Sequence, residues 1–193
     1  MDTKNLIAAI NKHVTLTTDE AAYFSSLMLP QPVRQGEMPE KIGQLTQYFI
    51  HVYSGCLMSY FTDKAGVDHV IQFATAGWWT GDLRSYTQQI PSIHATRALT
   101  ESEILLLPRP SFDELLEKVP KMERYFRILF QNSLVTHQDR LNQTLASTAE
   151  ERYQAFRKKY PALEQYVPQK YIASYLGITP EFLSKVRRKL MNK

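Results

Sequence analysis

Polar side chains near the C-terminus recur at a spacing that places them on one side of a helix. Steps of three, one and three residues define the face Glu181, Ser184, Lys185 and Arg188. In a DNA major groove, a carboxylate accepts from the cytosine amino group, and an ammonium donates to guanine O6 and N7. We therefore expect Glu181, Ser184 and Lys185 to read base edges.

Cations and one hydroxyl around this face have the chemistry to hold DNA phosphates, whose oxygens accept hydrogen bonds and attract positive charge. These residues are Lys170, Thr179, Arg187, Arg188 and Lys189. An ordinary helical hairpin with a solvated basic face is the alternative interpretation of the same pattern.

Two helices joined by a short turn must position this face. The first is expected over residues 169–176, with an apolar side formed by Ile172, Ala173 and Leu176. Gly177 can end it in a left-handed conformation, and Thr179 and Pro180 suit the N-cap and first turn of the next helix. That second helix is expected to bury Phe182, Leu183, Val186 and Leu190. The pattern is typical of a helix-turn-helix.

Composition excludes several classes of protein. Hydrophobic residues make up 44% of the 193 residues, which is enough for a sizeable core. The one cysteine, Cys56, excludes a disulfide framework and any four-cysteine zinc or iron–sulfur site. No run of roughly eighteen apolar residues and no signal-peptide core is present, so we expect a cytoplasmic protein that does not enter a membrane.

Charge is distributed unevenly along the chain. Residues 148–193 hold ten Lys/Arg against four Asp/Glu, a formal charge of +6, whereas residues 1–147 carry −2. A basic C-terminal module on a mildly acidic body is typical of a nucleic-acid binder.

The region before that module reads as helices followed by strands. Short amphipathic helices are expected over 2–12 and 17–29, the second capped by Thr17 or Thr18 and ended by Pro30 and Pro32. Apolar or alternating runs then predict strands over 47–54, 56–62, 67–73 and 104–107, separated by turn residues such as Ser54-Gly55. Strands at this spacing favour an antiparallel sandwich or barrel.

A long helix is predicted over residues 120–147. Apolar positions recur along it at steps of three or four residues, at Phe126, Phe130, Leu134, His137, Leu141 and Leu145. This near-heptad seam suits packing against an identical helix, so we expect a homodimer. Packing against the chain's own domain is the alternative. Another helix over 149–159 ends at Tyr160-Pro161.

The order of elements and several motifs resemble one family. The segments that carry the likeness are 54–57, 73–82, 149–153, 167–177 and 181–185. Segment 73–82 resembles the Phe…Pro-Gly-Glu…Gly-Glu stretch of the cyclic-AMP-receptor/FNR (Crp/Fnr) regulators, and 181–185 resembles the FNR-type Glu-x-x-Ser-Arg. The likeness to this family covers essentially the whole chain, and segment 167–177 is similar to the family's versions in Bacteroidetes-like bacteria.

The resemblance implies an α+β fold in three parts. Residues 1–118 would form a cyclic-nucleotide-binding-like antiparallel β-roll (a double-stranded β-helix), 119–147 the dimerisation helix, and 148–193 the helix-turn-helix domain. Family members usually add a two-stranded wing after the recognition helix, which we expect to be truncated here.

The implied function is transcription regulation on a near-palindromic operator. The implied partners are double-stranded DNA, a second copy of the chain, RNA polymerase and an unidentified small-molecule effector.

The motif for cyclic nucleotides departs from the family pattern. Family members pair a Gly-Glu, which holds the ribose, with an Arg about ten residues later, which holds the phosphate. Here Gly81-Asp82 matches the first pair, but Ser92 stands at the arginine position. We therefore expect that cyclic AMP is not the effector; a cyclic-nucleotide-responsive regulator with a divergent cassette is the alternative. An effector pocket is expected near Trp79, Gly81, Asp82, Arg84 and Arg97.

No cofactor or metal site is expected. One cysteine cannot build the FNR-type cluster, and His51, His69 and His94 read as structural rather than as haem ligands. A cupin-like metal enzyme is a remote alternative, because it needs converging histidines and the five histidines include no His-x-His pair. We expect no enzyme activity.

Overall fold

The computed structural model describes residues 3–191 and divides into two compact units. The first unit contains the residues up to 59 together with 73–132, and the second contains 60–72 together with the residues from 133 onward. The boundary between the two compact units therefore falls within the long helix, between residues 132 and 133. The division at 118/119 and 147/148 follows helix ends instead and stays a prediction.

The helices of the first unit are α1 (Lys4–Asn11), α2 (Thr18–Leu27), α3 (Leu83–Gln88), α4 (Arg109–Lys118) and the start of α5 (Lys121–Ala146). Of these, α1, α2 and α5 follow the predicted positions closely, whereas α3 was not predicted. Thr17 caps α2 in a capping box: its hydroxyl accepts from the Glu20 N–H at 3.2 Å, and the Glu20 carboxylate accepts from the Thr17 N–H at 2.7 Å. The prediction of a cap at this point is confirmed.

One antiparallel sheet of this unit has the order β1-β7-β2-β5. Its strands are β1 (Leu29–Val33), β2 (Tyr48–Ser54), β5 (Trp79–Thr80) and β7 (Ser102–Pro108). Pro30 and Pro32 do not simply end α2, as expected; they lie within β1. A strand can hold two prolines here because β1 is at the edge of the sheet, where a missing N–H costs no ladder bond.

A second sheet has the order β4-β3-β6, formed by β4 (Asp68–Thr75), β3 (Cys56–Thr62) and β6 (Ala95–Ala98). Gly55 joins β2 to β3 with φ +88°, a left-handed conformation. An added Cβ there would lie 2.2 Å from Ser102 Oγ and 2.6 Å from the Glu101 carbonyl oxygen. Only glycine fits this turn, which agrees with the expected Ser54-Gly55 turn signal.

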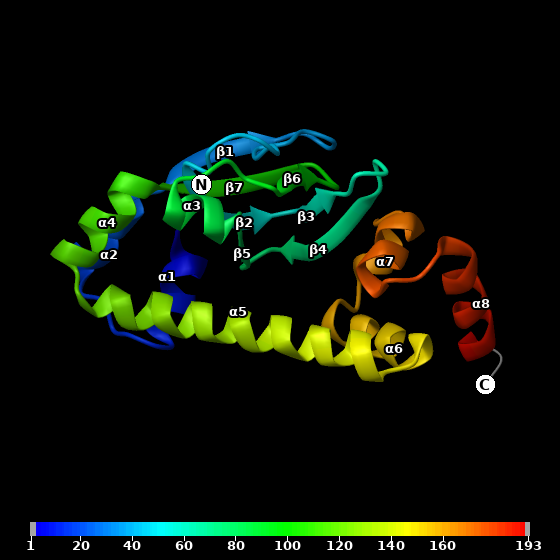
Figure 1. Ribbon diagram of the computed structural model, residues 1–193. Helices are drawn as coiled ribbons and strands as arrows, with labels where there is room; N and C mark the ends of the chain where they lie inside the picture. The colour runs from blue at the N-terminus through cyan, green and yellow to red at the C-terminus, as the bar shows by residue number, and fades with distance from the viewer. Residues whose placement is uncertain (1–2, 192–193) are drawn as a thin grey trace. The chain divides into compact units, whose positions relative to one another are not determined.

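The core of the first unit joins the sheet to the N-terminal half of α5, the long green-to-yellow helix of Figure 1. Phe49 stacks on Trp79 with ring centroids 4.8 Å apart, and Trp79 Nε1 donates to Tyr125 Oη at 3.0 Å. Phe126 is 2% exposed and packs in the same cluster. The expectation that Phe126 faces a second copy is therefore corrected, and the half-buried Phe130 also packs against this core.

The second unit holds the rest of α5 and the C-terminal helices. These are α6 (Ala149–Lys159), the 3-10 turn η1 (Leu163–Gln165), α7 (Gln169–Leu176) and α8 (Pro180–Met191). Along α5, Leu134, Leu141 and Leu145 are 59%, 58% and 77% exposed. Such a row of exposed leucines leaves the predicted seam open for a second copy. No helix in the part of the chain that the structure describes could span a membrane.

Burial of His51 makes the stability of the first unit depend on pH. His51 is 4% exposed on β2, its ring meets Trp79 edge-on at 5.1 Å, and burial lowers its pKa to about 4. The folded pKa thus lies below the unfolded value, so the unfolded chain binds the proton first as pH falls. The contribution is fully present above about pH 6.5 and is lost towards about pH 4.

We predict that His51→Leu flattens this dependence. Urea unfolding of the wild type should lose up to about 3 kcal/mol between about pH 7 and pH 4 beyond what the variant loses. Carboxylates contribute equally to the pH dependence of the unfolding free energy in both proteins. The difference between the two pH profiles therefore gives the contribution of His51. Parallel pH profiles of the two proteins would contradict the assignment.

Candidate functional site

The turn between α7 and α8 has the predicted chemistry. Gly177 adopts φ +67° and ψ +37°, and the Ile178 N–H donates to the Ala173 carbonyl at 3.0 Å. Thr179 Oγ1 accepts from the Phe182 N–H at 3.2 Å, which satisfies a free donor in the first turn of α8. These bonds fix where α8 begins relative to α7.

Apolar packing decides which side of α8 faces solvent. Leu183 and Val186 are 0% and 3% exposed, and on α7 the predicted positions Ile172, Ala173 and Leu176 are buried. The prediction that Phe182 is also buried is wrong, since its side chain is 48% exposed. Phe182 lies one residue, about 100° around the helix, from Leu183 and so turns away from α7. Leu190 is half-buried.

The predicted base-reading residues lie together on the open face of α8. Glu181, Ser184 and Lys185 are exposed, as is Arg188. The Ser184 hydroxyl donates to the Pro180 carbonyl at 3.0 Å, so only its acceptor lone pairs are available. A backbone N–H at the helix start and the Thr179 side chain lower the pKa of Glu181, which keeps it an anionic acceptor.

The predicted phosphate contacts fall into two groups. Arg188 is exposed on α8, and the Lys170 ammonium lies 4.8 Å from the Tyr171 ring centroid on α7. Lys189, by contrast, forms an ion pair with Glu150 of α6, and Arg187 Nε lies 4.0 Å from Glu164.

Two acidic partners were therefore missed by sequence reasoning. Glu150 and Glu164 anchor α8 to the rest of the second unit, and Glu164 also accepts from the Tyr153 hydroxyl. The ion pair of Lys189 joins residues 39 positions apart, a separation that has no periodic signal.

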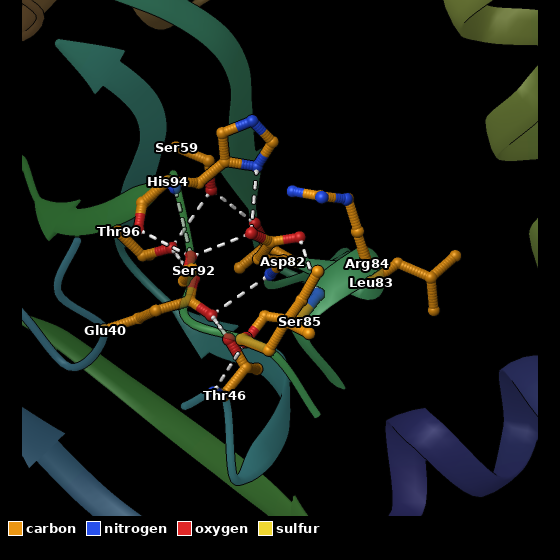
Figure 2. Close-up of polar contacts among 12 residues, drawn as sticks. Glu40, Thr46, Ser59, Asp82, Leu83, Arg84, Ser85, Ser92, His94 and Thr96 are labelled. Carbon is orange, nitrogen blue, oxygen red and sulfur yellow. Dashed lines mark hydrogen bonds and ion pairs between the residues drawn. The ribbon is translucent and has the colours of Figure 1, made fainter. Parts of the chain in front are cut away.

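The predicted effector region lies in the first unit and contains a buried hydrogen-bond network (Figure 2). Asp82 is 3% exposed and caps α3: its carboxylate accepts from the Ser85 N–H at 3.1 Å. The Ser92 hydroxyl donates to the other carboxylate oxygen at 2.8 Å, and His94 Nδ1 lies 3.7 Å from it. Thus the structure brings Ser92 directly onto Asp82.

Hydrogen bonds keep this carboxylate charged. Burial alone would raise the pKa of Asp82, but the bonds from Ser85 and Ser92 and the charge of His94 outweigh it and lower the pKa. Asp82 is therefore a buried anion, and it stands where the family pattern has the acidic residue that binds the ribose hydroxyl.

A second buried carboxylate, Glu40, was not expected from the sequence. It is 7% exposed and accepts from Thr46 Oγ1 at 2.5 Å, Thr96 Oγ1 at 2.8 Å and the Asp82 N–H at 3.1 Å. Figure 2 shows these groups converging from several segments of the chain. Because its partners lie 6, 56 and 42 residues away, no local motif marks Glu40.

The remaining predicted effector residues differ in environment. Trp79 is 7% exposed and packs inside the core, which corrects the expectation that it lines an open pocket. Gly81 adopts φ +135° just before Asp82. Arg84 is exposed on α3, and Arg97 lies on β6 with Nη2 3.9 Å from Met38 Sδ.

Neither a metal cluster nor a reactive thiol is found among the described residues. Within residues 3–191, no three His, Cys, Asp or Glu side chains gather as a metal site would need. Cys56 is fully buried, and burial raises the pKa of its thiol to about 12, which leaves it unreactive at neutral pH.

Residues 30–119 match the cyclic nucleotide-binding domain family. The chain is 25% identical to the fumarate and nitrate reduction regulatory protein of Vibrio cholerae over 167 residues, which are 81% of this chain and 66% of the relative. The chain thus spans slightly less than two-thirds of that relative's length.

Solved structures agree in fold. FixK2 from Bradyrhizobium japonicum is similar with a TM-score of 0.75 and 18% identity, covering 86% of this chain and 85% of that one. A transcriptional regulator of the Crp/Fnr family from Eubacterium rectale is similar with a TM-score of 0.71 and 16% identity, covering 91% and 84%. In its match to the cyclic nucleotide-binding domain family and in its fold, with the long α5 helix followed by a helical C-terminal unit, this chain resembles the regulators of the Crp/Fnr family.

Proposed function

We propose that the protein is a transcription regulator that binds double-stranded DNA through α8. One observation carries the proposal: α8 buries Leu183 and Val186 and turns Glu181, Lys185 and Arg188 to solvent. A helix with this layout, capped at its start and preceded by a glycine turn, suits the major groove. The related Vibrio cholerae protein is itself named a regulatory protein. Catalysis has no part in the proposal.

Each exposed side chain of α8 has a distinct task in this proposal. Glu181 accepts from a cytosine amino group, and Lys185 donates to guanine O6 and N7. Ser184 contributes as an acceptor, since its hydroxyl proton is used within the helix. The exposed ring of Phe182 offers an apolar contact to a thymine methyl group.

Phosphate contacts, in the same proposal, come from Arg188, Lys170 and Thr179. Arg187 and Lys189 can contact phosphates only if they break or share their ion pairs with Glu164 and Glu150, respectively.

A homodimer delivers two copies of α8 to one DNA duplex. Leu134, Leu141 and Leu145 are exposed along α5, and His137 is exposed among them, which supports this half of the predicted seam. Packing such a row against its two-fold mate buries apolar surface worth roughly 25 cal/mol per Å². A two-fold dimer reads a near-palindrome with half-sites roughly 34 Å apart.

The signal that controls binding is proposed not to be cyclic AMP. The ionised Asp82 bonds to Ser92, the residue that stands where the family's phosphate arginine is expected. A phosphate brought there meets an anion without the cation that normally offsets it. The match to a cyclic nucleotide-binding domain supports a second candidate, a regulator with a divergent cassette. An unidentified effector and contact with RNA polymerase remain predictions.

Two variants separate base reading from phosphate contact. Lys185→Ala should cost about 1–3 kcal/mol of binding free energy and relax the preference at one base pair. Arg188→Ala should weaken all sequences alike and make the slope of log affinity against log salt shallower by about one. Binding-site selection and fluorescence anisotropy measure both effects.

Lys118→Ala provides the control, because it also removes an exposed cation, here from α4 of the first unit. It should leave affinity and base preference unchanged. The assignment fails if Arg188→Ala alters the preferred bases while Lys185→Ala only lowers affinity, or if Lys118→Ala weakens binding as much as either.

The dimer is tested by placing charge on the seam. Leu134→Glu with Leu141→Glu would oppose like charges across the two-fold axis, so this variant should sediment as a monomer and lose DNA affinity. Val135→Glu introduces the same charge about 100° around α5 and should stay dimeric. A double variant that remains dimeric would reject the seam.

Cyclic AMP binding is tested by calorimetry on the full chain. No saturable heat is expected at micromolar to millimolar nucleotide, because Asp82 is ionised and no arginine stands at position 92. A dissociation constant in the low micromolar range would favour the divergent-cassette candidate instead.

A further inference from the structure

A cavity of about 420 Å³ lies within the second unit, between the C-terminal half of α5, α6 and the end of α7. Its volume is in the range of small-molecule sites, roughly 300–1,000 Å³. The lining residues are Thr136, Asp139, Arg140, Gln143, Thr144, Arg152, Ala155, Phe156, Lys158, Lys159, Tyr175 and Leu176. No part of the DNA-reading face contributes to this wall, so the cavity is a separate feature.

Positive charge dominates the cavity. The lining contains four cations and one carboxylate: the cations are Arg140, Arg152, Lys158 and Lys159, and the carboxylate is Asp139. Burial and the nearby charge of Arg140 lower the pKa of Lys159, and Asp139 only partly offsets them. Like charges held together in a partly buried space favour an anion that neutralises them.

Arg152 supplies a donor that lacks a partner. Its Nη1 donates to the Ser147 carbonyl at 3.0 Å and approaches the Thr144 carbonyl at 3.4 Å. Nε is buried and has no hydrogen-bond partner among the described residues. A buried donor without a partner costs about 1–3 kcal/mol and is rare, so it points to a group that is missing from the chain itself.

The aromatic part of the lining is held in place. Arg140 lies 4.1 Å from the Tyr175 ring centroid and donates to the Tyr175 carbonyl at 2.9 Å. The same guanidinium donates to the Val70 carbonyl at 2.7 Å and to that of Ile71. The Tyr175 ring in turn packs on the Phe156 ring, with the two ring centroids 5.7 Å apart. A wall fixed in this way loses little entropy when a ligand binds.

The cavity also stays open in the proposed dimer. Of its α5 lining residues, Thr136, Asp139, Arg140 and Gln143 lie about 120–180° around the helix from the row of Leu134, Leu141 and Leu145, and Thr144 lies about 80° from it. A second copy packed on the leucine row therefore leaves this side of α5 uncovered.

We propose that this cavity binds a small polyanion, with phosphate or carboxylate groups on Arg152, Lys158 and Lys159 and an apolar portion against Phe156 and Tyr175. Such a ligand contacts α5, α6 and α7 at once. It therefore sets how the helix-turn-helix is held on the end of the long helix. This inference does not depend on DNA binding.

Calorimetry on the full chain tests the proposal with two probes, inorganic pyrophosphate and citrate, at an ionic strength of about 0.15 M. At least one probe should bind with a saturable submillimolar dissociation constant. Pyrophosphate alone would identify a phosphate site, and citrate alone a carboxylate site. Arg152→Gln with Lys159→Gln should weaken binding by about tenfold or more, since each removes a charge-assisted bond.

Two further variants control for nonspecific attraction. Arg157→Gln removes an exposed cation of the same helix, ion-paired with Glu164 outside the cavity, and should leave probe binding unchanged. Asp139→Asn removes the cavity's carboxylate and should tighten binding a fewfold, a gain that a purely structural role would not give. Circular dichroism and thermal melting confirm that each variant folds.

Three results would overturn the proposal. The first is that neither probe binds with a dissociation constant below the millimolar range. The second is that Arg157→Gln weakens probe binding as much as the cavity variants do. The third is that the Arg152/Lys159 variant, without any probe, loses DNA affinity and shows a shallower slope of log affinity against log salt, which would assign these cations to DNA phosphates.

Discussion

Contact between two short helices determines what the C-terminal module can do. Leu183 and Val186 of α8 are buried together with Ile172 and Leu176 of α7, and burying each such side chain stabilises the pair by roughly 1.5–3 kcal/mol. Rotating α8 to hide its polar side would expose these residues and bury charges instead, which is far more costly. The polar face is therefore held towards solvent by apolar packing, and the caps at Gly177 and Thr179 fix its position along the helix.

The first unit keeps the fold of a cyclic nucleotide-binding domain but places different charges inside it. Asp82 and Glu40 are buried and bonded to hydroxyls and N–H groups of their own chain. Two unit charges of like sign about 4 Å apart repel by roughly 4 kcal/mol at an effective dielectric of about 20. Without an arginine at position 92, such repulsion alone would lower the affinity for a phosphate by about a thousandfold. The network instead joins the residue before α3, Asp82, to Thr96 of β6, because Glu40 accepts hydrogen bonds from both.

The sequence predicted those elements whose signals are local. The capping box at Thr17, the Gly55 turn and the Gly177–Thr179 turn each need only neighbouring residues, and each is confirmed. Short strands such as β5 and β6, and β1 with its two prolines, depend on pairing with distant strands and were missed. Glu40, Glu150 and Glu164 act on partners far along the chain, and Phe182 depends on a rotation of one residue about α8, so periodicity could not assign them.

We propose above all that two copies of α8, related by the two-fold axis of an α5 dimer, read one duplex. Hydroxyl-radical footprinting of the full chain on a duplex selected from random sequence tests it most directly. We expect two protected segments of related sequence, on one face of the DNA and roughly 34 Å apart. A single protected segment, or protection that does not depend on sequence, would contradict it.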